Sequence, residues 1–225
     1  MLERYLVLSP FPRALDGSHG LSRPTLHRYR VVPFDRSGDE GALEWPLPLP
    51  GAPLVYATLG TVNNQRTDIL RSFIEALRDE HVNVVVTVGR NGDPQQFGVQ
   101  PPNVRIERYI PQSLLFPACD LVISHGGSGT ILAGLDHGIP QVITPIAADQ
   151  PENAERAAAA GFARVVPADK ITAASIREAA VAVLANPTYR NAAEQIRDEM
   201  HALPGLAHVI ALLERLAIEK APILA

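Results

Sequence analysis

The sequence predicts an α/β protein in which a parallel sheet carries helices on both faces. Short apolar runs recur along the chain, at 54–58, 82–88, 121–123, 141–144 and 162–166. Their near-continuous hydrophobicity is typical of strands buried on both sides. Segments with apolar residues at helical spacing separate these runs. The alternation of the two kinds of element indicates a Rossmann-like parallel sheet.

Residues 1–50 differ in composition from the rest of the chain. They are rich in proline, and prolines alternate with leucines at 46–50, a pattern typical of a stiff, extended linker. Residues 6–8 and 29–32 are each expected to form a short edge strand. This part shows no apolar pattern that would build its own core. The expected organisation is therefore an N-terminal segment, 1–50, followed by a domain, 51–225.

Beyond the linker, strands and helices are expected in a regular order. The first strand precedes a helix whose apolar residues are Ile69, Leu70, Phe73, Ile74 and Leu77. A further short strand is expected at 104–106, and further helices at 112–116, 129–136, 151–160, 172–184, 188–202 and 206–216. Gly161 is a plausible left-handed residue after one helix, and Thr172 or Ser175 can cap the next.

Composition excludes several classes of function. The chain has 225 residues, 46% of them hydrophobic and 20% charged, as in an ordinary globular protein with a substantial core. A net charge of -4 without a Lys/Arg run argues against a nucleic-acid partner. The single cysteine, Cys119, excludes an internal disulfide and fits a reducing compartment. No apolar run reaches the about 18 residues of a membrane span, so we expect a cytoplasmic protein.

A glycine-rich turn is the most informative segment of the chain. Residues 124–130 read Ser-His-Gly-Gly-Ser-Gly-Thr between the strand at 121–123 and a helix. Glycine lets the backbone approach a ligand, and the unpaired N–H groups and dipole of the helix start favour an anion. Ser128 and Thr130 add hydroxyls and His125 adds an imidazole, which predicts a phosphate or diphosphate site. The alternative is a plain structural turn in which backbone groups satisfy His125.

Polar and aromatic residues also follow other strands, at the end of the sheet where parallel folds bind ligands. Thr58, Gly60 and Thr61 end the first strand, and a plain turn is one interpretation of them. Arg90 follows the next strand and either adds positive charge to the site or is solvated. Tyr109 offers a flat face for stacking or is a core aromatic residue.

Asp149 and Gln150 form a polar pair after the strand at 141–144. A carboxylate beside an amide suits the vicinal hydroxyls of a sugar. The pair followed by Pro151 is also good capping chemistry for the next helix. Both interpretations can hold together, with one oxygen of Asp149 capping and the other binding.

In their order along the chain these motifs resemble the donor-binding half of family 1 glycosyltransferases. They are Tyr-Ala-Thr-Leu-Gly-Thr at 56–61, Val-Thr-Val-Gly-Arg at 86–90, Arg-Tyr-Ile-Pro-Gln at 108–112, the glycine-rich turn, Gly-Ile-Pro-Gln at 138–141 and Ala-Asp-Gln-Pro-Glu-Asn-Ala at 148–154. The resemblance covers about residues 50 to 218 and is strongest to bacterial members that decorate natural products. It implies the C-terminal half of a two-domain GT-B enzyme. The nucleotide is then part of a substrate, a UDP- or dTDP-sugar, and neither a cofactor nor a metal is implied.

The resemblance also implies roles for individual residues. The donor diphosphate would contact Gly60, Thr61, His125, Gly127, Ser128, Gly129 and Thr130. The nucleobase would stack on Tyr109 and pair with the backbone of Ile110, and Gln112 belongs to the same motif. Asp149 and Gln150 would contact the transferred sugar.

Two departures from the family pattern matter. Plant relatives hold the ribose hydroxyls with a glutamate at the position of Ala133, so dTDP-sugar competes with UDP-sugar as the expected donor. The general base histidine of the family belongs to the acceptor domain, nearly all of which is missing here. His19 is a poor replacement, so catalytic residues are expected outside this chain.

The expected function is therefore the donor-binding half of an inverting hexosyltransferase that acts on a hydroxyl of a small-molecule natural product. Alone, the chain is expected to be inactive or weak. Its expected partners are the donor, the acceptor and an N-terminal acceptor-binding domain, in cis or as a separate subunit. The alternatives are a non-catalytic nucleotide-sugar-binding module and a nucleotide-sugar epimerase.

Overall fold

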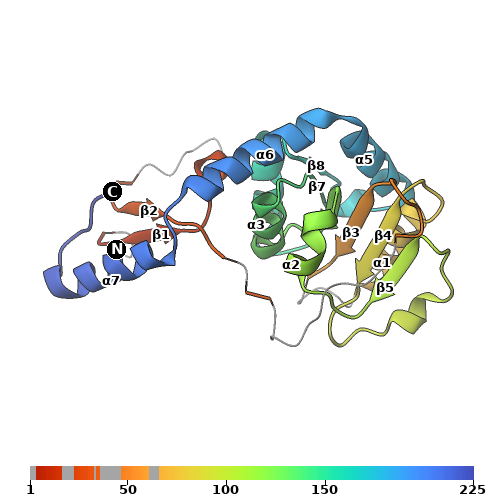
Figure 1. Ribbon diagram of the computed structural model, residues 1–225, viewed down its shortest axis with the longest axis horizontal. Helices are drawn as coiled ribbons and strands as arrows, with labels where there is room; N and C mark the ends of the chain where they lie inside the picture. Colours follow the sequence, from red (N-terminus) through yellow and green to blue (C-terminus); the bar gives the residue numbers. More distant parts are fainter. Residues whose placement is uncertain (1–3, 17–22, 33, 36–46, 61–65) are drawn as a thin grey trace.

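A six-stranded parallel sheet forms the centre of the protein. The computed structural model describes residues 4–16, 23–32, 34–35, 47–60 and 66–225. The strand order is β5-β4-β3-β6-β7-β8 (Figure 1). All strands are parallel, and the order in which the chain adds them across the sheet reverses between β3 and β6. The bounds are β3 Leu54–Thr58, β4 Asn83–Thr87, β5 Val104–Glu107, β6 Leu121–Ser124, β7 Gln141–Ile143 and β8 Ala163–Val165. The predicted Rossmann-like sheet is confirmed, and ligands bind such sheets at the point of reversal.

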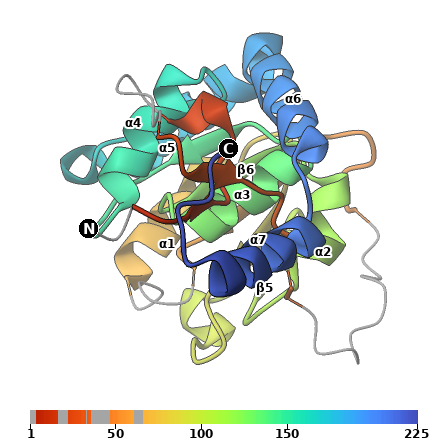
Figure 2. The same ribbon diagram turned by 90° about the vertical axis from the view of Figure 1, so that its left-hand side faces the viewer.

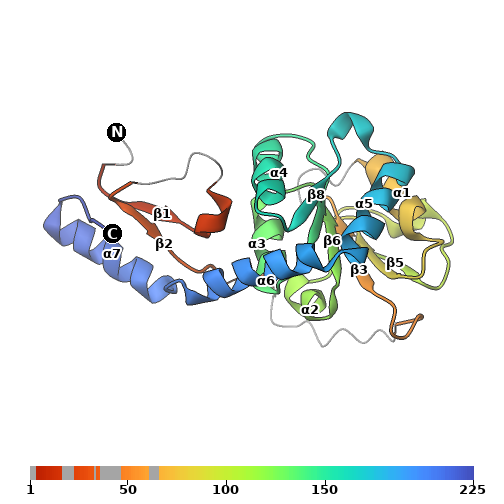
Figure 3. The same ribbon diagram turned by 90° about the horizontal axis from the view of Figure 1, so that it is seen from above.

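Helices cover both faces of this sheet (Figure 3). One face carries α1 (Thr67–Leu77) and α5 (Ala173–Ala185). The other carries α2 (Gln112–Leu115), α3 (Ser128–Asp136), α4 (Gln150–Ala159) and α6 (Pro187–Ala202). Side chains of β3 point alternately to the two faces. Val55 and Ala57 pack toward α1 and α5, and Tyr56 packs on the opposite side.

Short 3₁₀ helices and caps complete the description of these layers. The 3₁₀ segments are η1 Arg13–Leu15, η2 Pro94–Phe97, η3 Phe116–Ala118 and η4 Ala168–Lys170. Thr172 and Ser175 both cap α5, in a reciprocal capping box. Gly161 follows α4 with φ +80°, the left-handed conformation expected after a helix.

The protein also contains a second, two-stranded parallel sheet. It pairs β1 (Val7–Ser9) with β2 (Leu26–Arg28). The prediction of a strand at 29–32 is wrong, because the pairing between β1 and β2 ends at Arg28. The N–H of Arg30 instead donates to the carbonyl of Pro204 at 2.8 Å.

The last helix, α7 (Leu206–Glu219), lies against β1 and β2 and away from the larger sheet (Figures 1 and 2). Beyond it, the N–H of Ile223 donates to the carbonyl of Tyr5 at 2.8 Å. Within the described part of the chain, no single helix is long and apolar enough to cross a bilayer. Helices α6 and α7 reach that length and composition only as a pair, with a bend of 48° between them.

Candidate functional site

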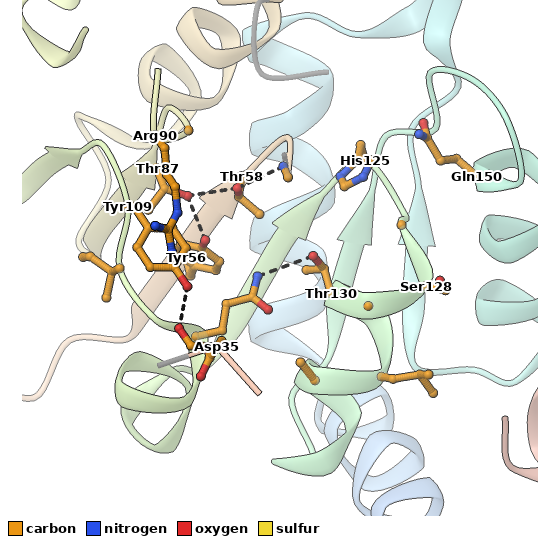
Figure 4. Close-up of a pocket in the computed structure, with 18 of the residues that line it drawn as sticks. Asp35, Tyr56, Thr58, Thr87, Arg90, Tyr109, His125, Ser128, Thr130 and Gln150 are labelled. Carbon is orange, nitrogen blue, oxygen red and sulfur yellow. Dashed lines mark hydrogen bonds between the residues drawn. The ribbon is translucent and has the colours of Figure 1, made fainter. Parts of the chain in front are cut away.

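A cavity of about 900 Å³ opens at the carboxyl ends of the central strands (Figure 4). Its position is the point where the strand order reverses, between β3 and β6. All but one of the residues predicted for the site line it: Gly60, Tyr109, Ile110, Gln112, His125, Gly127, Ser128, Gly129, Thr130, Asp149 and Gln150. The exception, Thr61, lies outside the described residues.

The glycine-rich turn delivers the start of α3 to this cavity. Gly126 has φ +82°, and a Cβ there would lie 2.7 Å from Cγ2 of Ile143, so only glycine fits. Helical geometry leaves the N–H groups of Ser128, Gly129 and Thr130 without an intrahelical acceptor. Among the described residues, no side chain caps this helix. The turn therefore presents unpaired backbone donors and the positive end of a helix dipole.

His125 is clamped between two glycines. An added Cβ at Gly60 would lie 2.6 Å from Cε1 of His125, and one at Gly127 would lie 2.6 Å from Nε2. Nδ1 of His125 is buried and has no hydrogen-bond partner among the described residues, so backbone groups there do not satisfy the ring. Burial lowers the pKa of His125, and the charge of Asp149 opposes this shift. At neutral pH the ring is therefore an uncharged imidazole.

A chain of hydroxyl groups runs along the floor of the cavity from β3 to β4 (Figure 4). The hydroxyl of Tyr56 lies 2.7 Å from Oγ1 of Thr87, which in turn donates to Oγ1 of Thr58 at 2.9 Å. Oγ1 of Thr58 also accepts the N–H of Gly60 at 3.1 Å. Since Thr87 has only one proton to donate, Tyr56 donates to Thr87. Oγ1 of Thr58 thus accepts two bonds, and neither of them uses its own proton.

The sequence did not reveal the part that Tyr56 plays in this chain. Burial raises the pKa of Tyr56, so its hydroxyl keeps the proton that it donates. The chain depends on Thr58 and Thr87 lying opposite each other in the register of β3 and β4. Which strands are neighbours and in what register is a long-range property that a local motif does not contain.

Asp149 occupies the N-cap position of α4 but makes no capping hydrogen bond. The capping interpretation is wrong because Asp149 has helical φ and ψ of −79° and −6°, whereas a capping side chain requires extended backbone. Ala148, just before it, has φ +56° and turns the chain into this geometry. Oδ2 of Asp149 instead accepts Nδ2 of Asn153 at 2.9 Å, and the same nitrogen donates to the carbonyl of Gly126 at 3.0 Å. Asn153 thus connects the two loops of the site.

The side chain of Gln150 is only partly available to a ligand. The residue is buried, and its Oε1 accepts the N–H groups of Ile146 and Ala147 at 2.8 and 2.9 Å. These two bonds use only Oε1 and do not involve Nε2 of Gln150. Gln112 likewise uses its Nε2 within the protein, where it donates to Oγ1 of Thr130 at 3.4 Å.

Tyr109 lies at the other end of the cavity and is held at two points (Figure 4). Its hydroxyl donates to the carbonyl of Asp35 at 2.7 Å. Arg90 lies over its ring, with Cζ 4.2 Å from the centroid, a cation–π geometry. Arg90 is exposed to solvent and also lies over this ring.

Residues from the N-terminal segment complete the cavity wall. Val31, Phe34 and Asp35 line it, although nothing in their local sequence marks them as site residues. Ala133 lines the cavity as well and offers only a methyl group. In the part of the chain that the structure describes, no three His, Cys, Asp or Glu side chains are placed to hold a metal ion together.

Known proteins resemble the chain in sequence. Residues 71–216 match the family described as erythromycin biosynthesis protein CIII-like, C-terminal domain. UDP-glycosyltransferase 2 of Phaeomoniella chlamydospora is 34% identical over 80% of this chain and 42% of its own length. The 3-alpha-mycarosylerythronolide B desosaminyl transferase of Saccharopolyspora erythraea is 32% identical over 94% of this chain and 49% of its own length. The chain thus spans about half the length of the curated relatives it matches.

The chain also resembles solved structures. Spinosyn rhamnosyltransferase SpnG complexed with thymidine diphosphate superposes with a TM-score of 0.79 at 29% identity. The superposition covers 93% of this chain and 56% of the other.

Proposed function

This chain belongs to the family of the erythromycin biosynthesis protein CIII-like C-terminal domain, and we propose that it is the donor-binding half of a natural-product glycosyltransferase. The whole enzyme would transfer a hexose from a nucleoside diphosphate sugar to an acceptor hydroxyl, with inversion. One observation carries the proposal: the start of α3, which no side chain of the described residues caps, lines one cavity together with the imidazole of His125. Such a constellation binds an anion.

The donor diphosphate would lie between α3 and the end of β3. On one side it would receive the N–H groups of Ser128, Gly129 and Thr130, and on the other the hydroxyl of Thr58 and a ring N–H of His125. As the glycosidic bond breaks, negative charge builds on the leaving diphosphate. Fixed donors of this kind stabilise that charge because they are oriented before the reaction begins.

The nucleoside would lie toward Tyr109, and we propose that it is thymidine. Tyr109 offers an aromatic ring at the cavity wall, and Ile110 follows it with backbone polar groups for the base edge. The side chain of Ala133 has no polar atom for a ribose 2′-hydroxyl, which favours a deoxyribose nucleotide. We therefore expect dTDP to bind more tightly than UDP.

A second domain would supply the acceptor site and the general base. Residues 51–225 hold the donor site in this proposal, and residues 1–50 belong to the acceptor side and its linker. A two-stranded sheet such as β1–β2 is marginal alone. Beside it, α7 leaves Leu206, Ile210 and Leu213 exposed at 51%, 56% and 48%, on one stripe of the helix. These features support an acceptor-binding domain packed here, in cis or as a separate subunit.

The same reasoning predicts that the chain alone binds donor and transfers little sugar. A non-catalytic nucleotide-sugar-binding module remains the second reading of that behaviour. The relatives compared above are named as transferases, so this reading is not favoured.

Calorimetric titration of the chain with dTDP, UDP and ADP tests the proposal. We expect micromolar binding of dTDP and weaker binding of UDP. ADP is expected to bind most weakly, because it carries a purine and the proposed site takes a pyrimidine base. A chain that binds none of the three would contradict the proposal. Equal affinity for UDP and dTDP would contradict only the proposed role of Ala133.

Replacing Asp149 with alanine is expected to lower affinity for dTDP-glucose by about 10- to 100-fold and affinity for dTDP by less than about 2-fold. A carboxylate hydrogen bond to a sugar hydroxyl is worth about 1.5–3 kcal/mol, and dTDP lacks that hydroxyl. The measurement is calorimetric titration of both ligands against wild type and variant. Equal losses for the two ligands would mean that Asp149 only supports the loop through Asn153.

A further inference from the structure

Asp35 connects the N-terminal segment to the loop that carries Tyr109 (Figure 4). Its backbone carbonyl accepts the Tyr109 hydroxyl at 2.7 Å. Its carboxylate accepts two bonds from Ser113: Oδ2 accepts the backbone N–H at 2.8 Å and Oδ1 accepts the hydroxyl at 2.7 Å. Since Ser113 lies in the first turn of α2, Asp35 bonds to both ends of the segment 109–113.

These bonds have different consequences. The two carboxylate bonds are charge-assisted and therefore strong, and they fix the backbone of Asp35 against α2. That anchoring places its carbonyl at the Tyr109 hydroxyl. Arg90 covers one face of the ring, with Cζ 4.2 Å from the centroid. The ring is thus held at its edge and on one face without any ligand.

We propose that Asp35 is a positioning residue for nucleobase recognition, which holds the Tyr109 ring in the orientation that stacks on the base. This inference rests on the proposed function, because it concerns the nucleotide site. Val31 and Phe34, near Asp35 in sequence, line the same cavity. Asp35 therefore couples binding of the base to the part of the N-terminal segment that lines the cavity.

The physical reason is preorganisation. A tyrosine side chain that is free to rotate loses that freedom when a base stacks on it, and the loss subtracts from the binding free energy. A ring already fixed by Asp35 avoids most of this cost. The gain applies only to ligands that carry a base.

The test uses Asp35→Ala, Tyr109→Phe and the double variant of the full chain. Phenylalanine keeps the stacking ring and removes only the bond to Asp35. Each single variant is expected to lower dTDP affinity by roughly 5- to 10-fold in calorimetry. The double variant is expected to lose no more than the larger single loss, because both changes break one connection. Inorganic pyrophosphate, which has no base, is expected to bind all four proteins equally.

Asp93→Ala is the matched control. Asp93 also caps a short helix, η2, by accepting the N–H of Gln95 at 3.0 Å, and it does not line the cavity. Its dTDP affinity is expected to equal that of wild type. Unchanged dTDP affinity in Asp35→Ala, equal losses for dTDP and pyrophosphate, or additive losses in the double variant would each overturn the proposal. Failure of the unmodified chain to bind dTDP would instead contradict the proposed function.

A second measurement needs no variant. Coupling between two sites is reciprocal, so dTDP must in turn stabilise the bonds of Asp35. The backbone amide of Ser113, which donates to that carboxylate, is expected to exchange with deuterated water roughly 5-fold more slowly at saturating dTDP. An unchanged exchange rate at Ser113 in the dTDP-bound chain would overturn the coupling.

Discussion

Replacing Gly60 with alanine is expected to weaken dTDP binding by about 100-fold. Gly60 has φ +68°, and a Cβ there would lie 2.6 Å from Cε1 and 3.1 Å from Nε2 of His125. The imidazole must therefore leave its place between the two glycines. The left-handed backbone adds strain of about 1–3 kcal/mol for a residue with a side chain. Calorimetric titration with dTDP measures the effect.

Gly51→Ala separates the two causes. Gly51 has φ +79°, and a Cβ there would meet nothing within 4 Å. The backbone strain is similar, but no side chain is displaced and the residue does not line the cavity. Gly51→Ala is expected to lose stability and keep its dTDP affinity. If Gly60→Ala bound dTDP as well as this control does, the position of His125 would have no bearing on the nucleotide.

Replacing His125 with alanine is expected to lower dTDP affinity by about 10- to 100-fold. The expected loss is that of one hydrogen bond to a charged group, about 1.5–3 kcal/mol. The change removes the only imidazole that lines the cavity among the described residues. Calorimetry gives the affinity, and thermal unfolding shows whether the fold is intact. A fully folded variant with wild-type affinity would contradict the predicted diphosphate contact.

The same residue predicts how affinity depends on pH. Burial lowers the pKa of His125 in the free chain, and a diphosphate beside the ring raises that pKa on binding. Binding therefore takes up a proton, and affinity rises as pH falls between the two values. The phosphate of dTDP also titrates, so the informative quantity is the wild-type pH dependence minus that of His125→Ala. We expect this difference to favour low pH, and a difference of zero would contradict a ring that faces the anion.

The elements and the glycine-rich turn could be predicted because their signals are local. The strand at 121–123 and the glycines after it specify the turn into α3 within about ten residues of sequence, by spacing and by backbone freedom. The capping box of α5 is equally local, and both Thr172 and Ser175 take part. Parallel sheets bind ligands at the carboxyl ends of their strands, and this rule predicted that the motifs would lie together there.

The remaining features depend on contacts between distant parts of the chain. Asp35 reaches Ser113 across 78 residues, and Tyr56 reaches Thr87 across 31, so no motif contains either pair. The backbone of Asp149 is set by the loop before it rather than by its own preference for capping. The strand expected at 29–32 failed for a similar reason, because Pro204 provides a competing acceptor for Arg30.

We infer that the start of α3 and the Tyr109 loop form one nucleotide site. Amide ¹H–¹⁵N spectra of the chain, recorded during titration with dTDP, test whether one ligand contacts both. We predict the largest shift changes at Gly127, Ser128 and Gly129 and at Tyr109 and Ile110, all saturating with one dissociation constant. Binding of dTDP that leaves these amides unshifted and moves those of another surface would contradict the claim.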